Sequence, residues 1–474
     1  MAKALVAGSS AAVLMLEILA GRLLAPYVGV SLETFTGIIG VVLAGIAIGA
    51  WAGGALSDSR DPASMIGPCL LLGGALSWLS LPLISALGPQ FDDGAVAITM
   101  LSLIALFPPA AVLSAISPMV AKLVLRDLSD TGTVVGGLSA FGTLGALVGT
   151  FVTGFVLVSA LPTRLTVIAI GAALVIWGIL THWHLTRSLP TMTAAGLLVL
   201  SGIVGVAAGQ PCDHVTTYFC ANVIVDDEVA SGRSLWLDGI RHAYVDLDDP
   251  TNLDIRYIRL FASVADAQPD GPIDSLHIGG GGFSFPRYLE EVRPGSTAVV
   301  LEIDGALVDL VEDELGLAPS DSLQTQVGDA RLALADMSAA SFDLAIGDAF
   351  ASRSVPWHLT TREFLGEVDR VLRDDGVYVM NVIDGGGYDF ARAELATLAE
   401  IFEHVRAIVP TNGLDAFKTA NVVLIAAHSP IDTSDAIALD EADGVLWTEA
   451  ETRAWMSDAE PLRDDFAPVD QLQQ

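Results

Sequence analysis

The pattern of apolar and polar positions divides the chain into two parts of opposite character near residue 210. Residues 1–210 contain apolar stretches long enough to cross the roughly 30 Å hydrocarbon core of a bilayer, which predicts a multi-span α-helical membrane domain. Spans are expected at residues 4–24, 34–56, 64–87, 95–113, 134–160, 165–179 and 191–208. Pro108 and Pro109 interrupt the fourth of them. Glycines about four residues apart, such as Gly145 and Gly149, favour close contact between helices.

The second part, residues 211–474, has shorter apolar runs. In residues 211–272, extended runs separated by the turn signals Ser231-Gly232 and Asp238-Gly239 predict a small β-hairpin module. In residues 273–474, apolar strands alternate with amphipathic helical patterns, which predicts an α/β Rossmann-like domain whose parallel sheet is covered by helices on both faces. Strands near residues 405–409 and 422–426 should complete the sheet as an antiparallel hairpin, and the tail from Asp432 is acidic.

Charge follows the same division. Residues 1–210 hold 7 Lys and Arg against 8 Asp and Glu, whereas residues 211–474 hold the remaining 16 and 48, which is −32 of the total net charge of −33. A domain this acidic repels phosphate, so we expect no nucleic-acid partner. The excess fits a cationic substrate, although solubility in high salt or a coding bias accounts for most of it.

A glycine-rich turn is the most informative motif in the second part. Four consecutive glycines follow the apolar run 275–278, and Glu302-Ile303-Asp304 closes the next apolar run about twenty residues later. Such a turn lets backbone amides approach a ligand, and an acid at the end of the second strand can accept both hydroxyls of a ribose. The spacing therefore predicts a nucleoside-binding βαβ unit. The cofactor-binding candidates are Gly279, Gly280, Gly281, Gly282, Glu302, Asp304, Asp329 and Ala330.

Four carboxylates fall at the carboxyl ends of successive predicted strands, where ligands bind in such sheets. They are Glu302, Asp304, Asp329 and Asp348. Asp304 and Asp329 have an equally good structural role as helix N-caps. Asp348 follows an apolar strand and precedes the irregular run 349–357, so its carboxylate should face the crevice. A general base is expected there.

With these motifs the chain resembles the spermidine synthases, and specifically the membrane-fused spermidine synthase-like proteins. In the second part the resemblance rests on Leu237-Asp238-Gly239, the glycine turn, Glu302-Ile303-Asp304, Gly328-Asp329-Ala330, Asp348 and the closing stretch 464–470. In the first part it rests on residues 17–29 and 136–155. The resemblance implies an S-adenosylmethionine-dependent methyltransferase-type fold and transfer of an aminopropyl group from decarboxylated S-adenosylmethionine to an amine.

The resemblance also implies roles for single residues. Glu302 would bind the ribose, Asp329 the adenine amino group, and Asp348 would deprotonate the amine. His242 and Tyr257 stand where the family binds its substrate. It implies an S-adenosyl cosubstrate, decarboxylated or not, a small-molecule amine acceptor and a lipid bilayer around the first part; it implies no metal or prosthetic group, and it allows a homodimer.

The sequence departs from the family where the diamine would bind. Gly282 and Ala351 occupy positions at which the family has acids, and Arg241 and Arg259 add positive charge nearby. Putrescine is therefore expected to be a poor acceptor. Two other functions stay open: a methyltransferase-like enzyme on the same sheet, and a transporter or sensor whose second part binds a nucleoside without chemistry.

The sequence predicts a multi-pass protein of the cell membrane. It does not decide on which side of the membrane the acidic domain lies. The distribution of Lys and Arg favours a cytoplasmic N-terminus. Seven spans would then place the acidic domain outside, where Cys212 and Cys220 would form a disulfide. Against this, nucleoside cosubstrates are cytoplasmic, and one span fewer reverses the orientation. A charge inside the first span, at Glu17, keeps the transporter alternative open.

Overall fold

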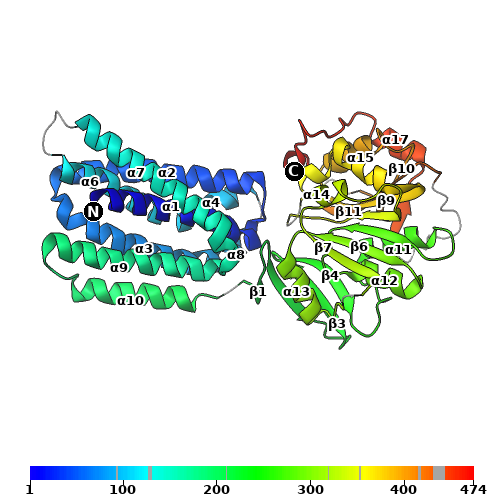
Figure 1. Cartoon of the computed structure of the whole chain (residues 1–474), viewed down its shortest axis with the longest axis horizontal. Coiled ribbons are helices and arrows are strands. Elements are labelled where there is room, and N and C mark those ends of the chain that lie inside the picture. The colour runs from blue at the N-terminus through cyan, green and yellow to red at the C-terminus, as the bar shows by residue number, and fades with distance from the viewer. Residues whose placement is uncertain are drawn as a thin grey trace. The chain divides into compact units, whose positions relative to one another are not determined.

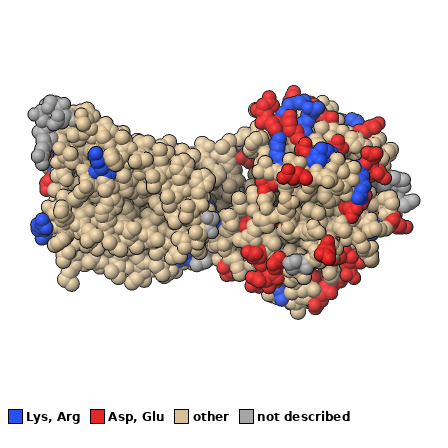
Figure 2. All heavy atoms as spheres, in the orientation of Figure 1, with Lys and Arg blue, Asp and Glu red and all other residues tan. Residues whose placement is uncertain are grey.

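The chain consists of two compact units, Met1–Val215 and Thr216–Gln474, shown in Figure 1. The computed structural model describes residues 1–91, 94–125, 131–209, 211–318, 320–351, 354–414, 418–430 and 443–473. The division lies five residues beyond the expected boundary at residue 210. Figure 2 shows Asp, Glu, Lys and Arg spread over the visible face of the second unit and sparse on that of the first.

The first unit is built mainly from α-helices. They are α1 (Ala2–Val28), α2 (Leu32–Ser59), α3 (Pro62–Leu87), α4 (Ala95–Ala105), α5 (Phe107–Ser114), α6 (Ile116–Val124), α7 (Thr131–Val152), α8 (Val158–Ala160), α9 (Thr163–Thr186) and α10 (Met192–Ala207). Among the residues that the structure describes, six stretches are long and apolar enough to cross a membrane: Ala2–Val28, Leu32–Ser59, Pro62–Gln90, Phe107–Val124, Thr131–Leu157 and Thr163–Thr186.

Two predicted spans differ from the structure. The fourth does not end at residue 113, because α4, α5 and α6 follow one another with bonds of the α-helical i→i−4 type across each junction, from Leu106 N to Ser102 O and from Ala115 N to Ala111 O. Its long apolar part is Phe107–Val124 rather than 95–113. The seventh appears as α10, whose 16 residues rise about 24 Å, short of a full hydrocarbon core.

Glycines bring these helices into close contact, as their spacing predicted. A Cβ added at Gly145 or Gly149 of α7 would overlap backbone atoms of Ala7 and Ala11 of α1. Because both positions advance by four in the same direction, α1 and α7 are parallel. Gly154 lies outside this contact, with nothing within 4 Å of an added Cβ. Small residues at such an interface let two backbones approach.

The second unit begins with an antiparallel module that matches the predicted hairpins. Its strands are β2 (Cys220–Val225), β3 (Gly232–Leu237) and β4 (Ile240–Asp246), after the short β1 (His214–Val215). β3 pairs with both β2 and β4, and its register shifts between Leu235 and Trp236. The amphipathic helix α11 (Arg256–Asp266) follows.

An eight-stranded sheet forms the centre of this unit, with the order β12-β10-β11-β9-β8-β5-β6-β7. The strands are β5 (Asp274–Ile278), β6 (Thr297–Glu302), β7 (Leu323–Val327), β8 (Phe342–Gly347), β9 (Leu372–Asp384), β10 (His404–Pro410), β11 (Ala420–Ala427) and β12 (Gly444–Leu446). The strands β5 to β9 pair in parallel, whereas β10 and β11 form an antiparallel pair beside β9. The predicted Rossmann-like fold is thus confirmed.

Helices cover both faces of this sheet (Figure 1). They are α12 (Ser284–Val292), α13 (Gly305–Glu314), α14 (Ala330–Ala335), α15 (Arg362–Val371) and α16 (Asp389–Leu398). Buried side chains of α11 and α12, such as Phe261 and Phe285, pack on one face. Those of α15 and α16, such as Phe364 and Phe390, pack on the other. Burial on both faces explains why the central strands read as continuous apolar runs.

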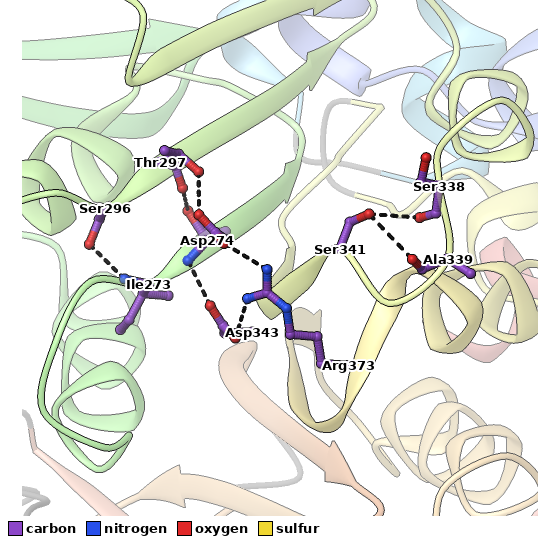
Figure 3. Close-up of polar contacts among 10 residues, drawn as sticks. Ile273, Asp274, Ser296, Thr297, Ser338, Ala339, Ser341, Asp343 and Arg373 are labelled. Atoms are coloured by element: carbon purple, nitrogen blue, oxygen red, sulfur yellow. Dashed lines mark hydrogen bonds and ion pairs between the residues drawn. The ribbon is translucent and has the colours of Figure 1, made fainter.

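The amino ends of three strands are tied together by one arginine (Figure 3). Nη2 of Arg373 lies 2.7 Å from Oδ2 of Asp274 on β5, and its Nη1 contacts Asp343 on β8. Asp274 N donates to Asp343 Oδ2 over 2.9 Å, and Thr297 Oγ1 of β6 donates to Asp274 Oδ1 over 2.7 Å. These contacts lie at the opposite end of the strands from the predicted crevice.

The chain after β12 returns to the sheet domain through α17 (Glu449–Trp455) and α18 (Val469–Leu472). Leu462 and Val469 are buried in the same core as α15 and α16. Residues 431–442 of the predicted acidic tail lie outside the described residues. Cys212 and Cys220 are both disulfide-bonded, whereas Cys69 is free.

Candidate active site

A crevice opens where the strand order of the large sheet reverses. From β5 the chain continues to β6 and β7 on one side, whereas β8 and β9 lie on the other. Ligands of open α/β sheets bind at such a point, outside the carboxyl ends of the strands. The crevice has a volume of about 100 Å³. The predicted site residues that line it are His242, Tyr257, Gly279, Gly281, Glu302, Asp329, Ala330 and Asp348.

The glycine turn joins β5 to α12 in a conformation that side chains would oppose. Gly279 has φ +99° and Gly281 has φ +50°, both in the region that favours glycine. A Cβ added at Gly279 would also lie 2.8 Å from the carbonyl carbon of Asp348. Gly279 therefore allows the ends of β5 and β8 to approach each other. Gly280 and Gly282 line a smaller cavity beside the crevice.

Glu302 ends β6 with its carboxylate against the glycine turn. Its Oε2 accepts a hydrogen bond from Gly280 N over 2.8 Å, and its Oε1 accepts one from Asp304 N over 2.9 Å. The residue is 6% exposed, and burial raises its pKa while these backbone bonds oppose the rise. A carboxylate oxygen can accept further bonds beside one backbone N–H. Glu302 is thus held in a position from which it can accept ligand hydroxyls.

The two carboxylate oxygens of Asp329 have different partners. Its Oδ1 caps α14 by accepting from Arg331 N over 3.0 Å and from Leu332 N over 3.2 Å. Its Oδ2 lies 3.0 Å from Nε2 of His358. Both residues line the crevice. The capping role and the position at the crevice are therefore compatible, and His358 adds an imidazole to this end of the site.

Asp348 follows β8 and lies where the crevice meets the smaller cavity. Its Oδ1 accepts from Asn381 Nδ2, and its Oδ2 accepts from the hydroxyl of Tyr257, each over 3.0 Å. Burial raises the pKa of Asp348 to about 6, against the opposing effect of these two donors. The carboxylate is therefore a fixed base that can take a proton near neutral pH.

His242 lies beside Asp348 and lines both spaces. Burial lowers the pKa of His242 to about 4, so the ring is neutral at physiological pH. Its Nε2 has no hydrogen-bond partner within the described part of the chain. The backbone carbonyl of His242 accepts from the Tyr257 hydroxyl over 3.3 Å. His242 thus presents an uncommitted ring nitrogen, while Tyr257 is committed to Asp348.

The structure corrects the expectation for Asp304. This residue is 0% exposed and does not line the crevice. Its Oδ1 caps α13 by accepting from Ala306 N over 3.1 Å and Leu307 N over 3.3 Å. The same carboxylate accepts from Thr217 N over 3.2 Å and Tyr218 N over 2.9 Å. Asp304 therefore anchors the start of the unit onto α13, and a contact between Asp304 and a ligand stays a prediction.

The structure also corrects the expectation that two arginines repel a cationic acceptor. Arg241 Nη1 lies 2.6 Å from Oδ2 of Asp254. Arg259 Nη1 donates to the carbonyls of Leu253 over 3.0 Å and Asp254 over 2.6 Å. Neither arginine lines the crevice or the smaller cavity. Arg241 of β4 is paired with Asp254, and Arg259 of α11 donates to backbone carbonyls of the segment before that helix.

Comparison with known proteins shows what the chain is similar to. No family model matches the chain. A polyamine aminopropyltransferase from Vibrio vulnificus is 29% identical over 215 residues, which are 42% of this chain and 69% of that protein. Another from Chromobacterium violaceum is 28% identical over 137 residues, 29% of this chain and 52% of that protein. The crystal structure of a probable spermidine synthase from Corynebacterium glutamicum has a TM-score of 0.51 at 26% identity and covers 54% of this chain and 97% of that one.

The chain is a spermidine synthase-like protein. The relatives named polyamine aminopropyltransferase and spermidine synthase are transferases. Within the described ranges, no group of three or more His, Cys, Asp and Glu side chains is arranged to hold a metal ion.

Three residues of this spermidine synthase-like site were missed from the sequence. Asn381 donates to the carboxylate of Asp348, and Asn421 Nδ2 donates to Asn381 Oδ1 over 3.0 Å. His358 contacts Asp329. The sequence contains one indication of the two asparagines, because each is a polar residue in or beside an otherwise apolar strand. His358 gave none, since it lies in the irregular segment after β8.

Proposed function

We propose that the chain transfers an aminopropyl group from decarboxylated S-adenosylmethionine to a small-molecule amine. The observation that supports this most directly is Asp348, a buried carboxylate oriented by Asn381 and Tyr257 between the crevice and the adjoining cavity. An amine is protonated at neutral pH and is not a nucleophile until it loses that proton. A positioned base at the point where donor and acceptor would meet is what this reaction requires.

In the proposed reaction the acceptor ammonium gives one proton to Asp348. The freed nitrogen lone pair attacks the aminopropyl carbon bonded to the sulfonium sulfur, so that a C–N bond forms while the C–S bond breaks. The bonding electrons remain on sulfur, which leaves as the neutral thioether 5′-methylthioadenosine, and the product amine carries the positive charge. Because the leaving group needs no proton, the protein contributes orientation and a base.

The nucleoside would occupy the other end of the crevice. Glu302 would accept bonds from the ribose hydroxyls, with its carboxylate held by Gly280 and Asp304. Asp329 would receive the adenine amino group, with His358 beside it. The backbone of the glycine turn would lie along the donor, since no side chain projects from Gly279 or Gly281.

We also propose that the first unit lies in a bilayer as a multi-pass domain. Its six long apolar stretches and low charge support this location. Arg164 Nη2 at the start of α9 donates to Gly205 O and Val206 O near the end of α10, so these two helices are antiparallel. On this basis we include α10, although it is shorter than the six long stretches, as a seventh pass. With the N-terminus in the cytoplasm, an odd number of passes leads to the second unit on the other side.

The proposed reaction is tested by product analysis on the full chain purified in detergent. The protein is incubated separately with decarboxylated S-adenosylmethionine and with S-adenosylmethionine, each with a panel of amines. Aminopropyl transfer predicts amine-dependent release of 5′-methylthioadenosine from the first donor only. Release of S-adenosylhomocysteine from the second would instead establish methyl transfer, and no thioether from either donor would contradict an enzymatic role.

A further inference from the structure

We propose that the acceptor is a primary monoamine with a short, uncharged alkyl body rather than a diamine. This inference rests on the proposed function and concerns the cavity that adjoins the crevice at Asp348. The cavity, of about 30 Å³, lies between β4, α11, the glycine turn and α12. We call it the acceptor cavity.

Part of the wall of the acceptor cavity is apolar, and part of it is polar. Ile258 and Phe261 of α11, Phe285 of α12 and Ile346 of β8 supply hydrocarbon and aromatic surface. All four side chains belong to a packed core, with Phe261 only 1% exposed and Ile346 only 2% exposed. These apolar side chains favour an acceptor whose alkyl body is apolar. A second ammonium group that found no partner beside them would lose its hydration at a high free-energy cost.

Asp348 is the single carboxylate that the acceptor cavity presents within the described part of the chain. The other acids of the site, Glu302 and Asp329, line the crevice but not this cavity. Each of them is also held by its own bonds on the nucleoside side. One carboxylate can balance one ammonium group, so a second ammonium group on the acceptor would find no carboxylate partner in this cavity.

The polar groups that remain in the acceptor cavity are neutral. His277 is fully buried beside Ser275, and burial lowers its pKa to about 3. His242 is likewise held neutral by burial, and its uncommitted Nε2 can form one hydrogen bond. Neutral imidazoles bind no ammonium with the strength of a carboxylate, because only a charge-assisted bond offsets desolvation of the cation.

The side chain of Ala243 also hinders a second acid at position 282 of the glycine turn. A Cβ added at Gly282 would lie 2.5 Å from Cβ of Ala243 on β4, well inside van der Waals contact. Gly282 and Ala243 both line the acceptor cavity. An aspartate at residue 282 therefore requires that the residue opposite it be smaller, and this chain has closed that space with the alanine methyl group.

The test compares n-butylamine with putrescine, which differ only by the second amino group. Initial rates are measured on the full chain with decarboxylated S-adenosylmethionine at one pH where both amines are protonated. We expect kcat/KM for n-butylamine to exceed that for putrescine at least tenfold. An equal or higher value for putrescine would overturn the inference.

A binding measurement separates this inference from the proposed function. Calorimetry on protein loaded with 5′-methylthioadenosine should show n-butylamine binding at least tenfold more tightly than putrescine. If neither amine is turned over but this order of binding holds, the proposed reaction fails and the monoamine site stands. If putrescine is turned over and binds at least as tightly, the reaction stands and the monoamine site fails.

Paired variants test the structural cause. The double variant A243G/G282D removes the methyl group and adds a carboxylate, so its preference should shift toward putrescine at least tenfold. Gly282→Asp alone meets Ala243 and should show a smaller shift, while Ala243→Gly is the matched control without the acid. An unchanged preference in a folded double variant would contradict the role given to this contact, and the comparison of the two amines on the native chain remains decisive if the variant does not fold.

Discussion

Asn381 donates a hydrogen bond from its Nδ2 to Oδ1 of Asp348, over 3.0 Å. The orientation of this carboxamide is set from the other side, because Asn421 Nδ2 donates to Asn381 Oδ1 over the same distance. The Asn381 side chain is therefore oriented with its NH₂ group toward the carboxylate of Asp348. Such a donor stabilises the ionised form of Asp348 and opposes the rise in pKa caused by burial.

The first prediction concerns the pH dependence of turnover. Asp348 must be ionised to act, so kcat/KM should rise with pH through about 6. Asn381→Leu removes the donor that favours the ionised form, which raises the pKa of Asp348. With about 1.5–3 kcal/mol for a bond to a charged group, the rising limb should move up by about one to two pH units. Asn421→Leu leaves that donor in place and should move it less. A limb that stays at the native position in Asn381→Leu would show that this contact does not tune the base.

The second prediction isolates the base itself. Asp348→Asn keeps the shape of the side chain but cannot take a proton, so turnover should fall about 10²-fold or more while 5′-methylthioadenosine still binds. Asp336→Asn, on the exposed end of α14, is the matched control and should leave both properties unchanged. Native turnover in Asp348→Asn would move proton abstraction to another group, with His242 as the next candidate.

The third prediction concerns recognition of the nucleoside. Glu302→Ala should weaken 5′-methylthioadenosine binding by about 1.5–3 kcal/mol, because charge-assisted bonds to the ribose are lost and the glycine turn loses its partner at Gly280. Glu291→Ala, an exposed glutamate at the end of α12 away from the glycine turn, is the control. Calorimetry that gives the same affinity for native protein and Glu302→Ala would remove Glu302 from the binding site.

The fourth prediction concerns an acid that lines neither the crevice nor the acceptor cavity. Glu394 of α16 is 0% exposed, and neither carboxyl oxygen has a hydrogen-bond partner among the residues described. Burial raises its pKa well above the ordinary value. The folded state thus holds a proton that the unfolded state releases, so stability falls as pH rises above about 4.5.

Glu394→Met should therefore raise the melting temperature of the second unit by a few degrees at pH 8 and by less at pH 5. Scanning calorimetry of the full chain at the two pH values measures the difference. Glu291→Met provides the exposed control. A destabilised Glu394→Met at pH 8 would mean that the carboxyl group has a stabilising partner.

The fifth prediction uses the Cys212–Cys220 disulfide to determine the side of the membrane. Disulfides persist in oxidising compartments and are reduced in the cytosol. If the second unit faces outward, a membrane-impermeant thiol reagent should label intact cells only after external reduction, and Cys212→Ser/Cys220→Ser should abolish that signal. Labelling that appears only after lysis would place the unit in the cytoplasm. The outward side would also require a nucleoside donor outside the cytoplasm, so the result bears on the proposed reaction.

The features that the sequence predicted correctly are those written in local patterns. Alternating strands and helices gave the sheet, and the glycine turn lies against Glu302 because both follow adjacent parallel strands. Asp348 was found because it directly follows an apolar strand. The roles assigned to these residues in binding and catalysis stay predictions.

The features that the sequence did not reveal depend on partners distant in the chain. Asn381 and Asn421 meet only through the antiparallel pairing of β9 with β11. Arg241 was expected near the acceptor, yet its ion pair with Asp254 holds it elsewhere. Asp304 had two roles open to it, and only the structure shows that backbone N–H groups of Thr217 and Tyr218 occupy its carboxylate.

The parallel contact between α1 and α7 sets an order of events during synthesis. Ala7 and Ala11 of α1 meet Gly145 and Gly149 of α7, with all of α2 to α6 between them in the chain. At about 5–20 residues per second, α1 leaves the ribosome on the order of ten seconds before α7 does. During that interval the small-residue face of α1 lacks its partner on α7. The contact between α1 and α7 therefore forms late in synthesis, after α2 to α6 have emerged.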